Sequence, residues 1–385
     1  MDFKKFFQNL KSFFATKKPL PSGFYAYQTP PELDEQYRLH LRIEKDGTGI
    51  LIINASTVLH LNQTAVENAY NMIRGLNIDE AVEEITHRYN VDSKQARFDY
   101  EEFVEKVETL IKTPDLDPVT YLDIDRQEPY SSDISAPYRL DCAVTYKVRQ
   151  DDSHSSAPIE RVDRELSTEE WKSIVHIAFD NGIPHILFTG GEPTLREDLP
   201  QLLQEAEDLG LVTGVLTDGL NLINDSYRTE FLQKGVDHLL ITLDPGNDQQ
   251  WIALGKILPE DVFTAVHLTL QHGSDLQGTI RRLAEMGTNA LSLSTTDPAL
   301  SNELKTLRDF AAMLQLDLVW DIPVPYSKNN PVSFELENAD SQKAPEGAGK
   351  AWLYIEPDGD VLPAQGVYEH ILGNILKDKW EDIWE

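Results

Sequence analysis

Four polar side chains follow segments that we predict to be β-strands, at the point where each segment ends. They are Glu192, Asp218, Asp244 and His272. In a barrel of parallel strands, the carboxyl ends of the strands meet at one face, and chemistry is usually found there. Three carboxylates and an imidazole at such a face could bind a cation or an amine. The sequence therefore predicts a polar site at the carboxyl ends of these strands.

The elements that would position this site alternate strand and helix from Tyr138 onward. The strand candidates are 138–144, 185–188, 212–216, 239–243, 265–270, 290–293 and 316–320. The helix candidates between them are 168–181, 198–208, 226–233, 276–286 and 302–314. This alternation indicates a parallel sheet with right-handed crossovers. We expect an α/β partial TIM-like barrel over residues 138–330, because no G-x-G-x-x-G of a doubly wound dinucleotide fold follows the first strand.

The motifs at the strand ends resemble those of the radical S-adenosylmethionine (SAM) superfamily. Gly190-Gly191-Glu192-Pro193 resembles the signature whose glycines let the backbone approach the methionyl group of SAM. Thr217-Asp218-Gly219 resembles the T-N-G of the third strand, and Thr242-Leu243-Asp244 resembles the S-L-D of the fourth. The resemblance implies the radical SAM fold. The SAM-pocket positions that it implies are Gly190, Gly191, Glu192 and Thr242.

The chain departs from this family at its cysteines. The family holds a 4Fe-4S cluster with three cysteines spaced C-x-x-x-C-x-x-C, whereas this chain has a single cysteine, Cys142, with Tyr146 and Arg149 at the next two positions. A cluster needs several thiolate ligands, and a guanidinium offers no lone pair. We therefore expect no 4Fe-4S cluster and no metal, and SAM would lose its main anchor. Arg149 could fill the space and pair with Glu192.

The C-terminal segment, residues 331–385, departs from its relatives in the same way. Trp352 to Pro363 resembles the hairpin of the SPASM extension, which binds auxiliary clusters in many relatives. Ala364 follows Pro363 where the family usually has a cysteine. Asp358-Gly359-Asp360 lacks the further carboxylates of a calcium loop. We expect a degenerate hairpin without a cluster.

Residues 24–112 form a predicted α+β unit of winged-helix-like type. Its strand candidates are 37–43, 49–53 and 57–61, with the hairpin turn Asp46-Gly47, and its helix candidates are 63–74, 78–89 and 93–111. The unit resembles the PqqD-like domains. That resemblance implies that a precursor peptide adds as a strand beside the third strand and packs on the last helix. The alternative is a unit that packs only within its own protein.

Two further segments flank this unit. Residues 113–137 are rich in Pro and Asp without a helical or strand period, which predicts a linker. Residues 1–18 carry five lysines against one aspartate and predict a basic amphipathic helix. Its apolar face would comprise Phe3, Phe6, Phe7, Leu10, Phe13 and Phe14. That face could lie in a membrane surface, or it could dock on a partner protein or on the chain's own core.

Composition limits the partners and the compartment. The formal net charge of −31 over 385 residues argues against nucleic acid, because phosphates would be repelled. No cleavable signal and no membrane-spanning apolar run is visible. We expect a cytoplasmic chain, with peripheral attachment to the inner face of the membrane if residues 1–18 bind lipid.

These observations lead to one hypothesis and two alternatives. The hypothesis is a non-catalytic radical SAM-like protein that binds a precursor peptide or a partner protein as a scaffold or accessory subunit. The first alternative is an enzyme that reuses the barrel pocket for SAM or another small ligand. The second is a structural subunit at the membrane surface.

Overall fold

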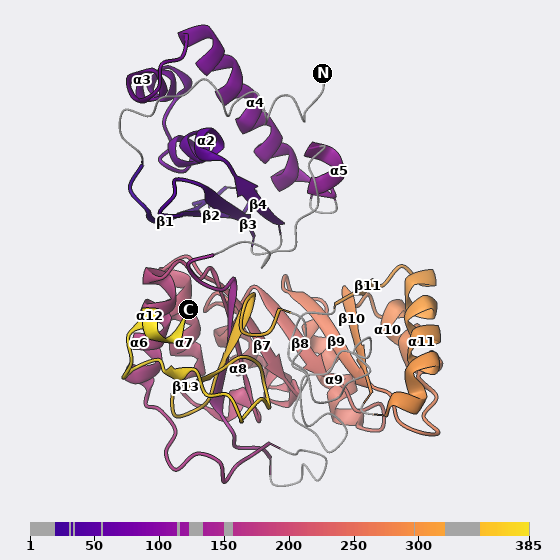
Figure 1. Cartoon of the computed structure of the whole chain (residues 1–385). Helices are drawn as coiled ribbons and strands as arrows, with labels where there is room; N and C mark the ends of the chain where they lie inside the picture. The colour runs from indigo at the N-terminus through magenta and orange to yellow at the C-terminus, as the bar shows by residue number, and fades with distance from the viewer. Residues whose placement is uncertain are drawn as a thin grey trace. The chain divides into compact units, whose positions relative to one another are not determined.

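A computed structural model describes residues 20–30, 32–33, 35–54, 57–113, 116–122, 134–149, 157–295, 297–319 and 347–384. The chain divides into two compact units (Figure 1). The first comprises residues 1–136 with 179–184, and the second comprises 137–178 with 185–385. The amphipathic segment 1–18, with Phe3, Phe6, Phe7, Leu10, Phe13 and Phe14, lies outside the described residues.

The first unit pairs a four-stranded antiparallel sheet with helices. Its strands, in the order β1-β2-β3-β4, are β1 (Gly23–Gln28), β2 (Arg38–Ile43), β3 (Gly49–Ile53) and β4 (Thr57–Leu61). Its helices are α2 (Gln63–Ile73), α3 (Ile78–Arg88), α4 (Ser93–Lys112) and α5 (Pro118–Leu122). The sequence predicted β2 to β4 and α2 to α4 but missed β1. It was wrong to predict no helix in the Pro- and Asp-rich segment, because α5 lies there.

Side-chain caps fix where the helices of the first unit begin. The Asn62 side chain accepts hydrogen bonds from two backbone N–H groups at the start of α2. Asn77 does the same for α3, while the Glu80 carboxylate accepts from the Asn77 backbone N–H. Asp92 caps α4. Each cap satisfies backbone donors that have no partner within the helix.

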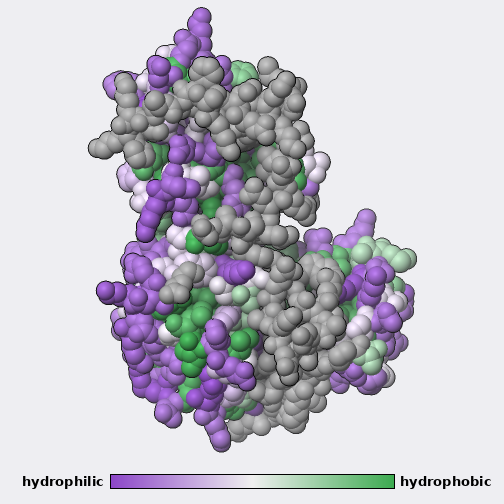
Figure 2. All heavy atoms as spheres, viewed as in Figure 1, coloured by the Kyte–Doolittle hydropathy of each residue, from purple (hydrophilic) through white to green (hydrophobic). Residues whose placement is uncertain are grey.

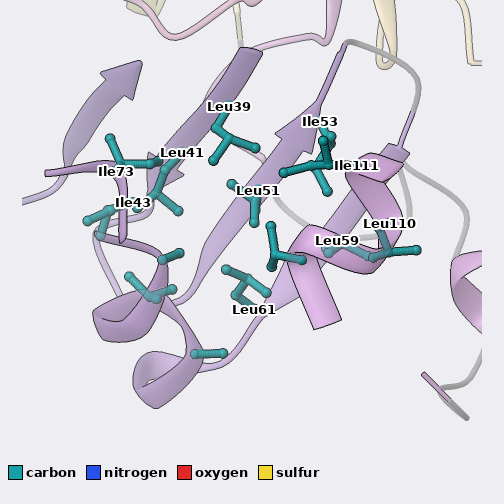
Figure 3. Packing of buried hydrophobic residues seen from close by; sticks show 14 of the residues in the cluster. Leu39, Leu41, Ile43, Leu51, Ile53, Leu59, Leu61, Ile73, Leu110 and Ile111 are labelled. Carbon is teal, nitrogen blue, oxygen red and sulfur yellow. The ribbon is translucent and has the colours of Figure 1, made fainter. Parts of the chain in front are cut away.

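The core of the first unit lies between the sheet and two of its helices (Figure 3). Alternate residues of β2, β3 and β4 point toward α2 and α4, as the two-residue period of a strand requires. Leu51 of β3 is fully buried at the centre of this cluster. The other members that Figure 3 labels are Leu39, Leu41, Ile43, Ile53, Leu59, Leu61, Ile73, Leu110 and Ile111.

The second unit is built on a parallel sheet with helices between successive strands. Its parallel strands are β5 (Arg139–Thr145), β6 (His185–Gly190), β7 (Val212–Thr217), β8 (His238–Thr242), β9 (Phe263–Thr269), β10 (Ala290–Ser294) and β11 (Asp317–Leu318). Within the described residues each strand pairs with the next along the chain, so the sheet order follows the sequence order. This architecture is consistent with the partial barrel that the sequence predicted.

Helices connect these strands. They are α6 (Thr168–Asp180), α7 (Leu199–Asp208), α8 (Asp225–Leu232), α9 (Asp248–Ile257), α10 (Leu276–Glu285) and α11 (Ser301–Met313). Short 3-10 turns lie at Pro193–Leu195, Leu220–Ile223 and Pro298–Leu300. The helix α9 was not predicted, and the other five begin and end within about two residues of the predicted bounds.

The C-terminal segment extends the same sheet. Strand β12 (Trp352–Ile355) pairs parallel with β5, and β13 (Asp360–Leu362) and β14 (Gly373–Asn374) continue antiparallel. A last short helix, α12 (Trp380–Ile383), follows. Figure 2 shows hydrophobic residues gathered on the face of this unit around these strands. Among the helices that the structure describes, none has the length and apolar content needed to cross a membrane.

The central position of Leu51 leads to a test of the first unit. Leu51→Ala should lower the free energy of unfolding of this unit by about 3 kcal/mol, because it removes buried contacts and leaves a cavity. Native-state hydrogen exchange at the amides of β2 to β4 measures this unit alone. Leu33→Ala is the control, because the Leu33 side chain is half exposed. Equal protection in the two variants would contradict the packing described above.

Candidate functional site

Gly190 and Gly191 lie directly against the backbone that leaves β5. A Cβ atom added at Gly190 would stand 2.1 Å from the Thr145 carbonyl oxygen, and one at Gly191 would stand 2.3 Å from that of Lys147. Gly190 also has a φ of 126°, which side-chain-bearing residues rarely adopt. The Gly191 N–H donates to the Thr145 carbonyl at 2.8 Å. The two glycines therefore join the exits of β5 and β6.

Glu192 ties these two exits to the exit of β7. Its buried carboxylate accepts hydrogen bonds from the Thr194 backbone N–H at 2.9 Å, the Thr217 hydroxyl at 2.7 Å and the Asp218 backbone N–H at 2.7 Å. The Thr194 hydroxyl donates to it as well. Burial and the nearby Asp218 carboxylate raise the pKa of Glu192 to about 7. The side chain is thus engaged with the chain itself, and the backbone around it is what a ligand would meet.

Arg149 pairs with Asp218, not with Glu192 as the sequence suggested. Its guanidinium donates to the Asp218 carboxylate at 2.6 Å and to the Asn221 side-chain oxygen at 2.8 Å. Glu192 is connected to this pair by the hydrogen bond from the Asp218 backbone N–H. The charge of Arg149 is therefore matched by the Asp218 carboxylate at the β7 exit. The Glu192 carboxylate already accepts four hydrogen bonds, so it is less available to a guanidinium than Asp218 is.

Tyr146 is held at the boundary between β5 and the C-terminal hairpin. Its ring is fully buried with Tyr354 and Leu362, and its hydroxyl donates to Glu356 at 2.9 Å. Arg161 donates two further bonds to the same Glu356 carboxylate, at 2.6 and 2.7 Å. The Arg161 guanidinium also lies 4.0 Å from the centre of the Tyr368 ring. This network fixes the exit of β5 on the hairpin.

Cys142 is a buried residue within β5. Its burial, and secondarily the neighbouring Asp141, raise the pKa of its thiol well above the ordinary value. A thiol in this environment is a poor thiolate ligand, since metals bind the thiolate. With Tyr146 and Arg149 held by hydrogen-bond partners, the residues present do not fit a cluster held by three thiolates of this chain.

The other predicted site residues lie at separate exits. Thr242 ends β8 and is half-buried. Asp244 accepts from the Gly246 backbone N–H within its own loop, and the exposed His272 imidazole lies 2.6 Å from Asp297. In the described part of the chain, no three His, Cys, Asp or Glu side chains come together as a metal site would require. Within the described residues, the four polar groups Glu192, Asp218, Asp244 and His272 therefore lie at the strand exits without forming a cation site.

Three residues of the site escaped the sequence analysis. Glu165 accepts from the Thr145 hydroxyl at 2.7 Å and from the Tyr146 backbone N–H at 3.0 Å. Gln250 of α9 donates to the Thr242 carbonyl at 2.8 Å and to the Asp218 carbonyl at 3.2 Å. His267 of β9 is buried among hydroxyl groups. The polar positions within apolar strands were the available signal for His267, whereas nothing local marks the other two.

The sequence and the fold of this chain are similar to those of known proteins. Residues 142–283 match the model of the radical SAM superfamily. The crystal structure of Streptococcus suis SuiB bound to S-adenosylmethionine is similar with a TM-score of 0.60 and 17% identity, over 92% of this chain and 88% of that one. SuiB bound to the precursor peptide SuiA is similar with a TM-score of 0.59 and 17% identity, over 90% of this chain and 87% of that one.

These findings correct two expectations. The expectation of a non-catalytic scaffold is contradicted by the match of residues 142–283 to the radical SAM superfamily and by the likeness to SuiB, whose crystal structures contain SAM and a precursor peptide. A chain without any cofactor is contradicted as well, because the family binds SAM and normally a 4Fe-4S cluster. Of these two groups, SAM is the one that requires no further thiolates.

The parallel sheet, the exits joined by Gly190 and Gly191 and the family match agree on one assignment. Residues 142–283 of this chain match the radical SAM superfamily and lie on a fold of that type.

Proposed function

We propose that this chain is a SAM-dependent enzyme that acts on a peptide. The observation that carries the proposal is the likeness over 92% of the chain to a protein whose crystal structures contain SAM and a precursor peptide. Both of its units are included in a likeness of that extent. The strand exits described above supply the place for SAM, and the first unit supplies a place for the peptide.

SAM would lie over the exits of β6, β7 and β8. Gly190, Gly191 and Glu192 would present backbone groups there, and the half-buried Thr242 would present a hydroxyl. SAM carries an ammonium and a sulfonium against one carboxylate, so an acidic surrounding favours it. The exposed Asp244 lies two residues beyond Thr242 and supplies such a charge. When bound, SAM provides an activated carbon–sulfur bond.

The residues around these strand exits hold the exits in place. Arg149 and Asn221 hold Asp218, and Gln250 holds the carbonyl of Thr242. Tyr146 and Glu356 hold the β5 exit on the C-terminal hairpin. These buried, mutually bonded groups pre-organise the exits, which lowers the cost of ordering them when a ligand binds.

The peptide would bind the first unit as an added strand, as in the PqqD-like domains that this unit resembles. Strand β4 is the last strand of its sheet among the described residues, so one side of its backbone has no neighbouring strand of that sheet. Leu59 of β4 packs in the same cluster as Leu110 and Ile111 of α4 (Figure 3). A strand added to β4 would therefore lie beside the end of α4. β-Augmentation of this kind draws its affinity from backbone hydrogen bonds.

The hydroxyl of Thr242 provides the first test. Thr242→Val should raise the dissociation constant for SAM about fivefold, the effect of losing one hydrogen bond. Isothermal titration calorimetry with SAM measures it. Thr264→Val is the matched control. Thr264 is buried near the start of β9, away from the strand exits, and its hydroxyl donates to the Val262 carbonyl. Equal affinity in the two variants, or no heat from the unmodified protein at 1 mM SAM (about the weakest useful affinity), would contradict the proposal.

The open side of β4 provides the second test. A peptide selected from a random phage-displayed library for binding to the full chain should slow hydrogen exchange at the β4 amides about tenfold, because it pairs with them. Val58→Lys should weaken the binding of that peptide, since a charge on an edge strand opposes strand pairing. Ala26→Lys, an exposed position on the other edge strand β1, is the control. Protection at β1 in place of β4 would count against this mode of binding.

A further inference from the structure

One face of the parallel sheet changes from apolar to polar toward the strand carboxyl ends. Leu240, Ala265 and Ala290 lie side by side on β8, β9 and β10 and belong to one apolar cluster. Two residues further along each strand, Thr242, His267 and Ser292 are register partners in the same way. Because side chains alternate along a strand, both rows lie on the same face. Figure 1 shows the three strands side by side.

His267 is the centre of the polar row. Its Nδ1 lies 3.0 Å from the Ser292 hydroxyl, and its Nε2 lies 3.1 Å from the Ser294 hydroxyl and 3.3 Å from that of Thr269. Burial lowers the pKa of His267 to about 4. The imidazole is therefore neutral near pH 7, so one ring nitrogen donates a hydrogen bond and the other accepts one. The whole row carries no formal charge.

The polar row is not what packing alone requires. Burying an imidazole and hydroxyl groups carries a desolvation cost that apolar side chains avoid. The neighbouring row on the same three strands shows that apolar residues are accommodated there. A polar row next to it, at the strand ends where barrel enzymes place their sites, indicates a binding role.

The exposure along the row shows from where it can be reached. His267, Ser292 and Ser294 are buried, whereas Thr242 and Thr269, the last residues of β8 and β9, are only half-buried. A group that reaches the row would therefore pass the two threonines. We expect it to be uncharged, because Thr242, His267 and Ser292, the side chains that form the row, carry no charge that would offset its desolvation. It would also have to donate and accept hydrogen bonds.

We propose that His267, with Ser292 and Ser294, binds an uncharged amide group of the peptide substrate. This subsite rests on the proposed function for the existence of that peptide. An amide N–H and C=O match an imidazole and hydroxyls, each of which donates and accepts. The row thereby favours a backbone amide or an Asn or Gln side chain over a charged side chain.

N-methylacetamide, the smallest model of a peptide bond, tests the subsite in the full chain. In protein labelled with ¹⁵N-histidine, its addition should shift the His267 ring resonances with a midpoint of about 10 mM, as expected for so small a ligand. Sodium acetate and methylammonium, its charged counterparts, should leave them in place. His238 is the internal control, because it is a half-buried histidine on the same face of β8 but at the opposite end of the strand. Ser292→Ala should raise the midpoint of the N-methylacetamide titration about fivefold, since one hydrogen bond is lost.

Several outcomes would overturn the proposal. One is that the His267 ring resonances do not shift when N-methylacetamide is added. Others are an equal shift of the His238 resonances and an equal shift of His267 with acetate. Failure of N-methylacetamide to shift His267 once SAM is saturating would also overturn it, because SAM itself would then occupy the row. SAM binding itself is measured separately by calorimetry. A failure of the proposed function is therefore distinguishable from a failure of this subsite.

Discussion

The close approach of two backbones, from Gly190 to Thr145 and from Gly191 to Lys147, is the constraint on which the site depends. No side chain fits between them, since a Cβ atom would stand 2.1 or 2.3 Å from a carbonyl oxygen. This contact aligns the exits of β5 and β6. It also places Glu192 so that its carboxylate reaches the exit of β7. The ends of β5, β6 and β7 are thereby held together by the segment from Gly190 to Glu192, without any ligand.

Tyr146 and Arg149, the positions where the resemblance led us to expect cysteines, strengthen that arrangement. Arg149 neutralises Asp218 at the β7 exit, and Tyr146 anchors the β5 exit to Glu356 of the C-terminal hairpin. Both side chains are partly or fully buried, so their hydrogen bonds are shielded from water. The C-terminal hairpin thus supports the strand exits together with the parallel sheet, because β12 of the hairpin also pairs with β5.

The secondary structure was predictable wherever a period ran long enough to be counted. The alternating residues of β2 to β4 and the buried runs of β5 to β10 are local signals, as are the caps at Asn77 and Asp92. The helix α9 was missed because its segment mixes Gln, Trp and Gly with weak amphipathic order. Strand β1 was missed because its residues are half exposed and lack a buried face. The charge partner of Arg149 was also missed, because it lies 69 residues away in the sequence.

The sequence by itself determined the ancestry of the domain and the order of its strands. Gly-Gly-Glu-Pro and the strand-end motifs are local patterns, and parallel strands joined by helices leave few topologies open. Only the tertiary structure decided what those residues contact. Glu192 is engaged with the β7 exit, Arg149 with Asp218, and His267 with hydroxyls on the next strand. The physical reason is that hydrogen bonds between strand ends depend on register and burial, which join residues far apart in the chain and leave no trace in local spacing.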